Sequence, residues 1–252
     1  MARKYPLGWV KLSFSLAVLC NLFVYSEFTY SQEAIQLNFN VRPPFMIKHE
    51  DGTVAGSSAT PAINAFERAK IPYKLNEASP ARQLKDLKDN EIQVCSIGWY
   101  KTIEREHFAK FTAPISQDTP MIGLANSAFN PGKTPTLDDV LGNKNTRILI
   151  KKSIVYGPFL EKKFSSMNAQ KLGTYAEFSQ MFKMITMGRA DLTFIPHEEA
   201  TYYLSFAGYK ESDFRVIQFS KMPPGEKRYL MCSMKVSDDT IQRLNDALPN
   251  YK

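Results

Sequence analysis

Apolar and polar residues alternate strictly over residues 35–41, with four apolar side chains on one face and three amides on the other. A repeat of two residues is typical of a β-strand, because successive side chains point to opposite faces. Pro43-Pro44 interrupts this strand, and residues 45–50 continue in an extended pattern up to Asp51-Gly52. That dipeptide is typical of a tight hairpin turn. The sequence therefore predicts a strand followed by a short hairpin.

Helical and extended patterns alternate in the next part of the chain. Thr60, followed by a proline, is predicted to be a helix N-cap, and apolar residues at helical spacing continue to about Lys70. A short alternating strand follows at residues 73–75, Pro80 opens a second helix, and residues 92–97 form an apolar strand. This β-α-β-α-β order predicts a parallel sheet with helices on its faces.

The same alternation starts again after a polar stretch at residues 126–136. We expect helices at residues 137–142, 158–164 and 178–185, the last closed by Gly188, and strands at residues 147–150, 171–174 and 191–195. Two extended runs, at residues 214–219 and 229–234, precede a final helix that begins at Ser237. Two α/β units in a chain of 252 residues predict two lobes.

The segment that follows the strand at residues 92–97 carries the first candidate chemistry. Thr102 stands where a helix N-cap belongs, and Arg105 lies one turn into the expected helix. Backbone N–H groups at a helix start, together with a guanidinium, suit a carboxylate or another anion. An ordinary strand-turn-helix junction with a solvated arginine is the structural alternative.

The N-terminus has the pattern of a secretory signal peptide. Three basic residues precede an apolar run at residues 12–25, and small residues follow at Thr29 and Ser31. We expect cleavage near Ser31, with a site after Ser26 as the second choice. A membrane anchor is the alternative, although the run is shorter than the ~20 residues that span a bilayer. Cleavage would place the mature chain in the periplasm.

Export leaves two cysteines in the mature chain, Cys95 and Cys232. Both lie in apolar, strand-like runs, and an oxidising compartment allows them to form one disulfide. Two buried free thiols are the alternative.

The chain carries 32 lysines and arginines against 25 acidic residues, a formal charge of +7. These basic residues are spread along the sequence, whereas a nucleic-acid footprint requires a cluster. We therefore expect a solvated basic surface and no nucleic-acid partner. His49, His107 and His197 show no metal-ligand spacing, so we expect neither a metal nor a cofactor.

Six short motifs occur in one order along the mature chain. They are Pro43-Pro44-Phe45 with a hairpin to Gly56, Arg82-x-Leu84-x-x-Leu87, Gly98-x-x-x-Thr102-x-Glu104-Arg105, Phe111-x-x-Pro114, Thr136-Leu137-x-Asp139-x-x-Gly142 and Gly188-Arg189-Ala190-Asp191. With these motifs the chain resembles the family 3 extracellular solute-binding proteins, the amino-acid-type periplasmic receptors of ABC importers.

The resemblance implies a two-lobed α/β fold of the type II periplasmic-binding-protein kind, with two hinge crossings and a ligand clamped between the lobes. It implies a signal peptide at residues 1–31, lobe 1 at residues 34–117 and 220–252, and lobe 2 at residues 118–219. The family binds the ligand carboxylate with the arginine of its Thr-x-x-Arg motif, which is Arg105 here with Thr102 beside it. Pairing of Arg105 with a neighbouring glutamate, Glu104 or Glu106, is the structural alternative.

Several positions depart from the family pattern. Arg42 replaces the usual aromatic before Pro-Pro-Phe, and Trp99 precedes Tyr100, which stands where the family usually has a small hydroxyl residue. The family's Gly-Thr-Thr turn corresponds to Ser153-Ile154-Val155. Pro196 stands where the family has the acid that holds the ligand ammonium. An α-ammonium would therefore be left unpaired in the cleft, which disfavours a free α-amino acid as the ligand.

The predicted ligand site combines positions that match the family with positions that depart from it. It comprises Arg42, Phe45, Gly98, Trp99, Tyr100, Thr102, Arg105, Ser153, Tyr156 and His197. Arg42, Lys101 and Arg105 would make the cleft cationic, and Trp99, Tyr100 and Tyr156 would supply aromatic walls. Glu198 and Glu199 follow His197, and we interpret them as the acidic start of a helix.

These features favour a monomeric periplasmic binding protein that captures a small, carboxylate-bearing or otherwise anionic solute, for an ABC importer permease or a membrane sensor. One alternative is a periplasmic lyase or dehydratase on the same fold, for which His197 or Glu198 would be the acid or base. We expect no enzyme, because no nucleophile, base and orienting group occur together. A degenerate receptor that acts through protein contacts is a further alternative.

Family members continue beyond the final helix, which leaves open a truncated chain or a missing covering element.

Overall fold

The computed structural model describes residues 1–2, 33–206 and 208–249. The chain divides into residues 1–31 and residues 32–252, and the fold below belongs to the second unit. All but the first two residues of the expected signal peptide, and the last three residues of the chain, lie outside the described part. Within the described residues, no helix is long and apolar enough to cross a membrane.

The first sheet has five strands in the order β4-β1-β5-β12-β6. Their bounds are β1 (Ile35–Phe39), β4 (Tyr73–Glu77), β5 (Val94–Trp99), β6 (Ala109–Gln117) and β12 (Lys227–Ser233). β1 runs parallel to β4 and β5, whereas β12 is antiparallel to both β5 and β6. A strand from near the C-terminus therefore lies between two strands of the N-terminal half.

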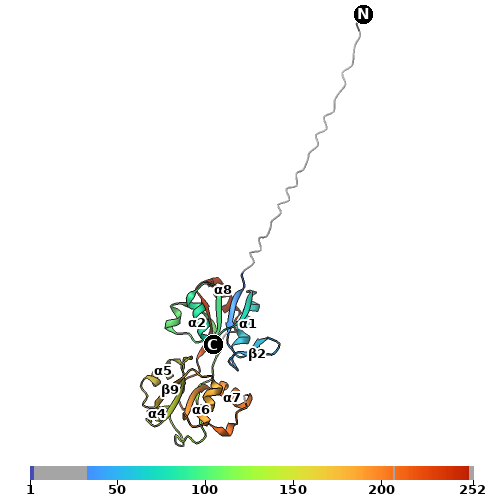
Figure 1. Cartoon of the computed structure of the whole chain (residues 1–252). Coiled ribbons are helices and arrows are strands. Elements are labelled where there is room, and N and C mark those ends of the chain that lie inside the picture. Colours follow the sequence, from blue (N-terminus) through green and yellow to red (C-terminus); the bar gives the residue numbers. More distant parts are fainter. Residues whose placement is uncertain (3–32, 207, 250–252) are drawn as a thin grey trace. The chain divides into compact units, whose positions relative to one another are not determined.

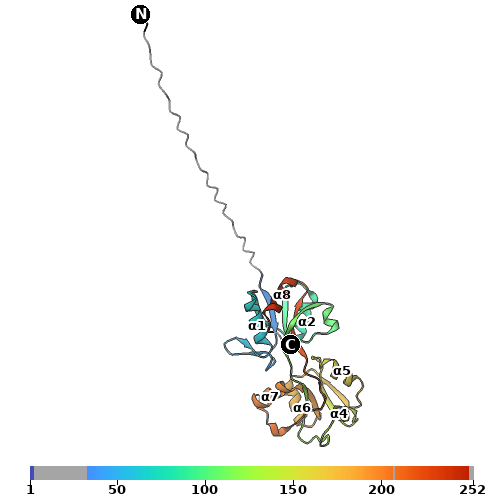
Figure 2. The ribbon, with the colours of Figure 1, turned by 180° about the vertical axis from the view of Figure 1, so that it is seen from behind.

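This sheet packs with α1 (Ala59–Arg68), α2 (Pro80–Asp89), α3 (Ile103–Glu106) and α8 (Asp238–Ala247), and β2 (Ile47–Lys48) and β3 (Val54–Ala55) form the expected hairpin. In both ribbon views, α1, α2 and α8 gather around it (Figures 1 and 2). We call this group lobe 1.

The second sheet has the order β11-β7-β10-β8-β9. Its strands are β7 (Met121–Asn126), β8 (Arg147–Lys151), β9 (Gln170–Thr174), β10 (Leu192–Pro196) and β11 (Phe214–Ile217). It packs with α4 (Leu137–Gly142), α5 (Gly157–Ser165), α6 (Phe178–Thr186) and α7 (His197–Phe206), and a 3-10 turn, η1 (Glu211–Asp213), precedes β11. We call this group lobe 2. The two sheets confirm the mixed α/β fold class.

Local signals placed most helix ends correctly. Thr136 caps α4, where its Oγ1 accepts from the Asp139 N–H at 3.1 Å, and Gly188 follows α6 with a φ of +68°. The Thr60 prediction is wrong: α1 begins at Ala59 after Ser58, and the Thr60 Oγ1 accepts from the Gly56 N–H at 3.1 Å. Ser58 is the residue before α1, but it makes no side-chain capping bond, and its buried hydroxyl bonds to Ser116 Oγ at 2.8 Å.

The polar face of the first strand is buried as well as the apolar face. Asn38 is fully buried, although the alternation of β1 assigns it to the polar side. Its Oδ1 accepts from Gln36 Nε2 at 2.9 Å and from Asn76 Nδ2 at 2.8 Å. Because β1 is flanked by β4 and β5 and helices pack on both faces of the sheet, its polar face also loses contact with water.

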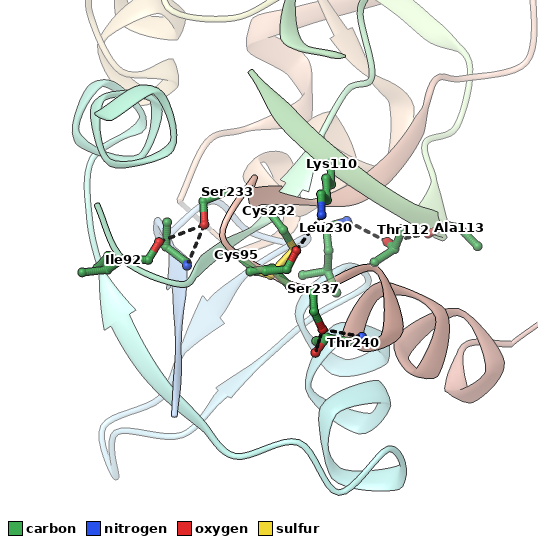
Figure 3. The surroundings of a disulfide bond; sticks show 12 residues. Ile92, Cys95, Lys110, Thr112, Ala113, Leu230, Cys232, Ser233, Ser237 and Thr240 are labelled. Atoms are coloured by element: carbon green, nitrogen blue, oxygen red, sulfur yellow. Dashed lines mark hydrogen bonds between the residues drawn. A yellow bond between two sulfur atoms is a disulfide. The ribbon is translucent and has the colours of Figure 1, made fainter. Parts of the chain in front are cut away.

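Cys95 and Cys232 form a disulfide between the neighbouring strands β5 and β12, where the two residues are direct partners (Figure 3). Both cysteines are fully buried. Beside them, Ser233 Oγ donates to the Ile92 carbonyl at 2.9 Å (Figure 3). The bond ties the returning C-terminal strand to the centre of the first sheet.

Two chain segments cross between the sheets, one after β6 and one before β12. The two segments are hydrogen-bonded to each other: the Asp118 N–H donates to the Glu226 carbonyl at 2.9 Å. Their close approach requires a glycine: a Cβ at Gly225 would lie 2.1 Å from the Asp118 carbonyl oxygen.

A buried ion pair holds the same crossing. Arg228 donates from Nε and Nη2 to the two oxygens of Asp118 at 2.5 and 2.8 Å, and from Nη1 to the Gly98 carbonyl at 2.9 Å. Tyr100 donates its hydroxyl to the same carboxylate. The Arg228 guanidinium lies 3.9 Å from the centre of the Phe45 ring. Both charges are almost fully buried, so each one needs the other to offset its loss of hydration.

Removing the disulfide should destabilise the protein. In Cys95→Ala/Cys232→Ala we expect the free energy of unfolding to fall by about 2–5 kcal/mol, because the unfolded chain regains the entropy of a long closed loop. Chemical denaturation of the two proteins measures this. Refolding the wild type in reductant should reproduce the loss, and reductant should not affect the variant. Equal midpoints for the reduced and oxidised wild type would contradict the bond.

Breaking the Asp118–Arg228 pair should cost more than replacing it. Asp118→Ala leaves a buried guanidinium unpaired, and we expect a loss of about 3–5 kcal/mol in the free energy of unfolding. The double change Asp118→Val/Arg228→Met removes both charges and should lose clearly less than the single change. Denaturation curves of the three proteins test this, and a single variant within ~1 kcal/mol of wild type would refute the role of the pair.

Candidate functional site

The turn between β5 and α3 forms as the sequence predicts. Thr102 is the N-cap of α3, and its Oγ1 accepts from the Arg105 N–H at 3.3 Å. The helix that follows spans only Ile103–Glu106, so the candidate chemistry rests on the Arg105 side chain rather than on a helix terminus.

The Arg105 guanidinium is positioned by two neighbours on β5 and the turn after it. Its Nη1 donates to the Tyr100 carbonyl at 2.7 Å, and its Cζ lies 4.7 Å from the centre of the Trp99 ring. Trp99 is itself fixed, because its Nε1 donates to Gln83 Oε1 at 2.9 Å. The guanidinium is thus held between a carbonyl and an aromatic face.

Arg105 has no acidic partner among the described residues. Glu106, one of the two glutamates considered for it, pairs instead with Lys101 at 2.7 Å. Partial burial lowers the pKa of Arg105, and the charge of Glu104 opposes this effect without forming an ion pair. The guanidinium is therefore desolvated and uncompensated, which favours contact with an anion.

A cavity of about 70 Å³ lies beside Arg105. Six of the ten predicted site residues line it: Arg42, Gly98, Trp99, Tyr100, Arg105 and Ser153. Ser153 lies in the loop after β8 of lobe 2, followed by Ile154 and Val155, which also face the cavity. The structure thus brings residues of both lobes together around Arg105.

The other four predicted site residues lie away from this cavity. Phe45 is buried against Arg228, and Thr102 serves as the cap of α3. Tyr156 lies in the core of lobe 2, where its hydroxyl accepts from the Lys151 N–H at 2.8 Å and burial raises its pKa to about 12. His197 lines separate hollows near Pro120 and Met121.

Tyr100 lines the cavity but commits its hydroxyl elsewhere. The hydroxyl donates to Asp118, and burial raises the pKa of Tyr100 above its ordinary value, an effect that the charge of Arg228 opposes. Tyr100 therefore stays neutral at physiological pH and connects the cavity wall to the crossing between the sheets.

Arg42 faces the cavity, but a carboxylate already neutralises it. Its Nε and Nη2 donate to the two oxygens of Glu199 on α7, each at 2.8 Å. Burial would lower the pKa of Arg42, but the charge and hydrogen bonds of Glu199 outweigh burial and raise it. Arg42 and Arg105 thus both line the cavity, as predicted, whereas Lys101 does not. Because Glu199 pairs with Arg42 and Glu106 pairs with Lys101, the cavity is less cationic than the sequence predicts.

The two glutamates at the start of α7 behave differently. Glu198 acts as a helix-start residue, as predicted: the Thr119 N–H donates to its Oε1 at 3.1 Å, and its own N–H donates to Thr119 Oγ1 at 3.0 Å. Burial raises the pKa of Glu198, and the Thr119 bond opposes this. Glu199 also lies in the first turn of α7, as predicted, but it is fully buried and binds Arg42, a contact that the helix-start interpretation did not include.

Sequence reasoning missed three charged residues around the cavity: Asp118, Glu199 and Arg228. Each lies within or beside an apolar stretch that forms a strand or a helix start. A charged residue in such a stretch was the one signal in the sequence that it would be buried. The described residues contain no group of three or more His, Cys, Asp and Glu residues that could hold a metal ion.

Comparison with known proteins identifies the fold. No family model matches the chain, and no curated protein matches it. Among solved structures, an ancestral arginine-binding protein bound to arginine matches with a TM-score of 0.66 and 16% identity, over 85% of this chain and 90% of that chain.

Two other neighbours are a periplasmic domain and a component of an ABC uptake transporter. The periplasmic VFT2 domain of Bordetella pertussis BvgS matches with a TM-score of 0.66 and 18% identity, over 86% of this chain and 87% of that chain. A substrate-binding protein of a Streptococcus pneumoniae ABC uptake transporter, with bound histidine, matches with a TM-score of 0.64 and 18% identity, over 85% of each chain.

At these sequence identities the comparisons show the fold alone. This fold is the one that the six sequence motifs predict. The chain has the two-lobed α/β fold of periplasmic binding proteins, the Venus flytrap fold.

Proposed function

We propose that the protein is a periplasmic receptor that binds a small carboxylate-bearing or otherwise anionic solute in the cavity beside Arg105. The observation that carries this proposal is the Arg105 guanidinium, which faces the cavity without an acidic partner among the described residues. A partly buried cation of this kind gains most from an anion that supplies two acceptor oxygens.

The surroundings of Arg105 suit this role. The Trp99 ring and the Tyr100 carbonyl fix the plane of the guanidinium, so little side-chain entropy remains to be lost on binding. The remaining N–H groups of the fork are left for a ligand. Of the residues that lobe 2 contributes to the described lining, Ser153 is the one with a polar side chain.

The size of the cavity limits the ligand. About 70 Å³ is far below the roughly 300–1,000 Å³ typical of sites for drug-sized ligands. Either the solute is very small or the lobes separate to admit it. We propose that residues 34–117 with 220–252, and residues 118–219, move as the two lobes about the crossing at Asp118 and Glu226.

One neighbour is a substrate-binding protein of an ABC uptake transporter and another is a periplasmic domain of BvgS, which supports a receptor role. We propose a permease or a membrane sensor as the partner. The arginine-bound and histidine-bound neighbours hold amino acids. In this chain the buried carboxylate of Glu199 is already bound to Arg42 and is not free to hold a ligand ammonium, which favours an anionic ligand without an ammonium.

Binding explains the lining better than catalysis does. Acid–base catalysis needs a titratable group in reach of the substrate. The described lining offers arginines, aromatics, apolar residues, an amide and a hydroxyl, whereas Glu198 is bonded to Thr119 and His197 lies elsewhere.

A panel of small carboxylates tests the proposal. At about 100 times its Kd, a ligand should stabilise the fold by ~2.7 kcal/mol and raise the Tm by roughly 5–10 °C.

Arg105→Ala should weaken the binding of any hit by about 100-fold, because a charge-assisted bidentate contact is lost. Arg189→Ala, which removes an exposed arginine, is the matched control and should bind as wild type. A hit that binds Arg105→Ala unchanged would reject the anchor, and turnover of the hit, seen by mass spectrometry, would favour an enzyme.

The contact between Trp99 and Arg105 predicts a graded series. Trp99→Phe retains a ring under the guanidinium and should lose about threefold in affinity, whereas Trp99→Ala frees the guanidinium and should lose about tenfold or more. Arg105→Lys keeps the charge but not the fork, and should fall between the wild type and Arg105→Ala. Calorimetric titration of the best hit measures the series. Equal affinities for Trp99→Ala and the wild type would show that the ring does not position Arg105.

A further inference from the structure

An arginine of lobe 1 pairs with a buried carboxylate of lobe 2. Arg42 and Glu199 are 157 residues apart in the sequence, and their side chains meet in a two-point contact with both N···O distances at 2.8 Å. Glu199 is fully buried, and 17% of the Arg42 side chain is exposed. This contact joins the segment after β1 to helix α7.

The backbone around Arg42 holds the side chain in this position. The Arg42 N–H donates to the Met46 carbonyl at 2.9 Å, and the Arg42 carbonyl accepts from the N–H groups of Phe45 and Met46, each at 3.0 Å. These three bonds close a tight turn at the edge of lobe 1. The side chain that leaves this turn reaches out of its own lobe.

Aromatic rings flank the guanidinium where it meets Glu199. The Arg42 Cζ lies 5.3 Å from the centre of the Phe45 ring and 5.7 Å from the centre of the Phe178 ring on α6. A buried carboxylate with aromatic faces around it is the combination that recognises guanidinium and ammonium groups. Only the Phe45 ring belongs to lobe 1, so lobe 2 supplies the carboxylate and one face.

Other charged groups near this pocket are already compensated. Lys151 approaches the Phe178 ring at 5.5 Å, but its ammonium pairs with Glu177 at 2.8 Å and donates to the Ala176 carbonyl at 3.0 Å. Among the described residues, Arg42 is the only cation in ion-pair contact with Glu199. Removing Arg42 would therefore leave Glu199 as a buried carboxylate without its counter-charge.

We propose that Glu199, Phe45 and Phe178 form a cation site for guanidinium or ammonium groups, and that the protein occupies this site with its own Arg42. The Arg42 guanidinium bridges the lobes in the place where a cationic ligand group would otherwise bind. The site is separate from Arg105, and the proposal does not depend on the carboxylate proposed to bind there.

Chemical rescue tests the site directly. In Arg42→Ala the side chain is truncated at Cβ, which leaves room for methylguanidinium between the two rings and Glu199. We expect methylguanidinium to raise the Tm of the full-length Arg42→Ala protein, with an apparent affinity at least about tenfold higher than for the wild type, where Arg42 competes. Methylammonium should bind more weakly, because it lacks the two-point fork. A Tm of Arg42→Ala that responds to methylguanidinium no more than the wild type does would overturn the proposal.

Two control variants separate a specific site from a general effect of the salt. Arg42→Ala/Glu199→Gln keeps the cavity but removes the carboxylate, and it should lose the rescue. Arg189→Ala creates no cavity at an ion pair, and it should respond as the wild type does. Retention of the rescue in the double variant would also overturn the proposal, because Glu199 would then not be the receptor.

A folding assay covers the case in which Arg42→Ala does not purify in a folded state. The variant is then refolded from denaturant with and without methylguanidinium, and circular dichroism follows the helix signal. Recovery with methylguanidinium in Arg42→Ala, and not in Arg42→Ala/Glu199→Gln, supports the site. No recovery refutes it. Because methylguanidinium has no carboxylate, neither result depends on Arg105, and the carboxylate panel on the wild type remains a separate test.

Discussion

A guanidinium taken out of water needs compensation, and the arrangement of the cavity follows from how three arginines obtain it. Arg228 is compensated within its own region by Asp118, with help from the Gly98 carbonyl. Arg42 is compensated by Glu199 in the other lobe. Arg105 has a carbonyl and an aromatic ring, but no carboxylate among the described residues. Under the proposed function, this difference between the three arginines directs a solute anion to Arg105.

The returning strand β12 connects this electrostatic arrangement to the fold. It lies between β5 and β6, carries Cys232 of the disulfide, and places Arg228 opposite Asp118 at the crossing between the sheets. The same Asp118 carboxylate accepts the Tyr100 hydroxyl, and the Tyr100 carbonyl accepts from Arg105. A continuous chain of hydrogen bonds therefore runs from the crossing to the candidate ligand anchor. If the lobes move about this crossing, the contacts of Asp118 and Tyr100 connect that movement to the position of Arg105.

The resemblance in the sequence and the chemistry of the cavity lead to different expectations for the ligand. Receptors for free amino acids pair the ligand ammonium with an acid, and Pro196 occupies that position here. The structure does provide a buried acid nearby, Glu199, but it is bound to Arg42. On our proposals, Glu199 is a receptor for a cation that the protein fills with its own Arg42, and Arg105 is the group left for an anionic solute.

The sequence by itself determined the features that depend on neighbouring residues. The strand at β1, the cap at Thr102, the capping box at Thr136 and the turn at Gly188 all follow from local patterns, and they placed Trp99 and Arg105 together on one turn. The α/β class followed from the order of these elements. The local pattern did not reveal that α1 begins at Ala59, or that the Ser58 hydroxyl bonds to Ser116, a residue far away in the chain, instead of capping the helix. Only the tertiary structure decided which charges are neutralised. Arg42 and Glu199, or Asp118 and Arg228, meet through the packing of the sheets and the path of the crossings, and the strength of a charge pair depends on distance and burial in space rather than on separation along the chain.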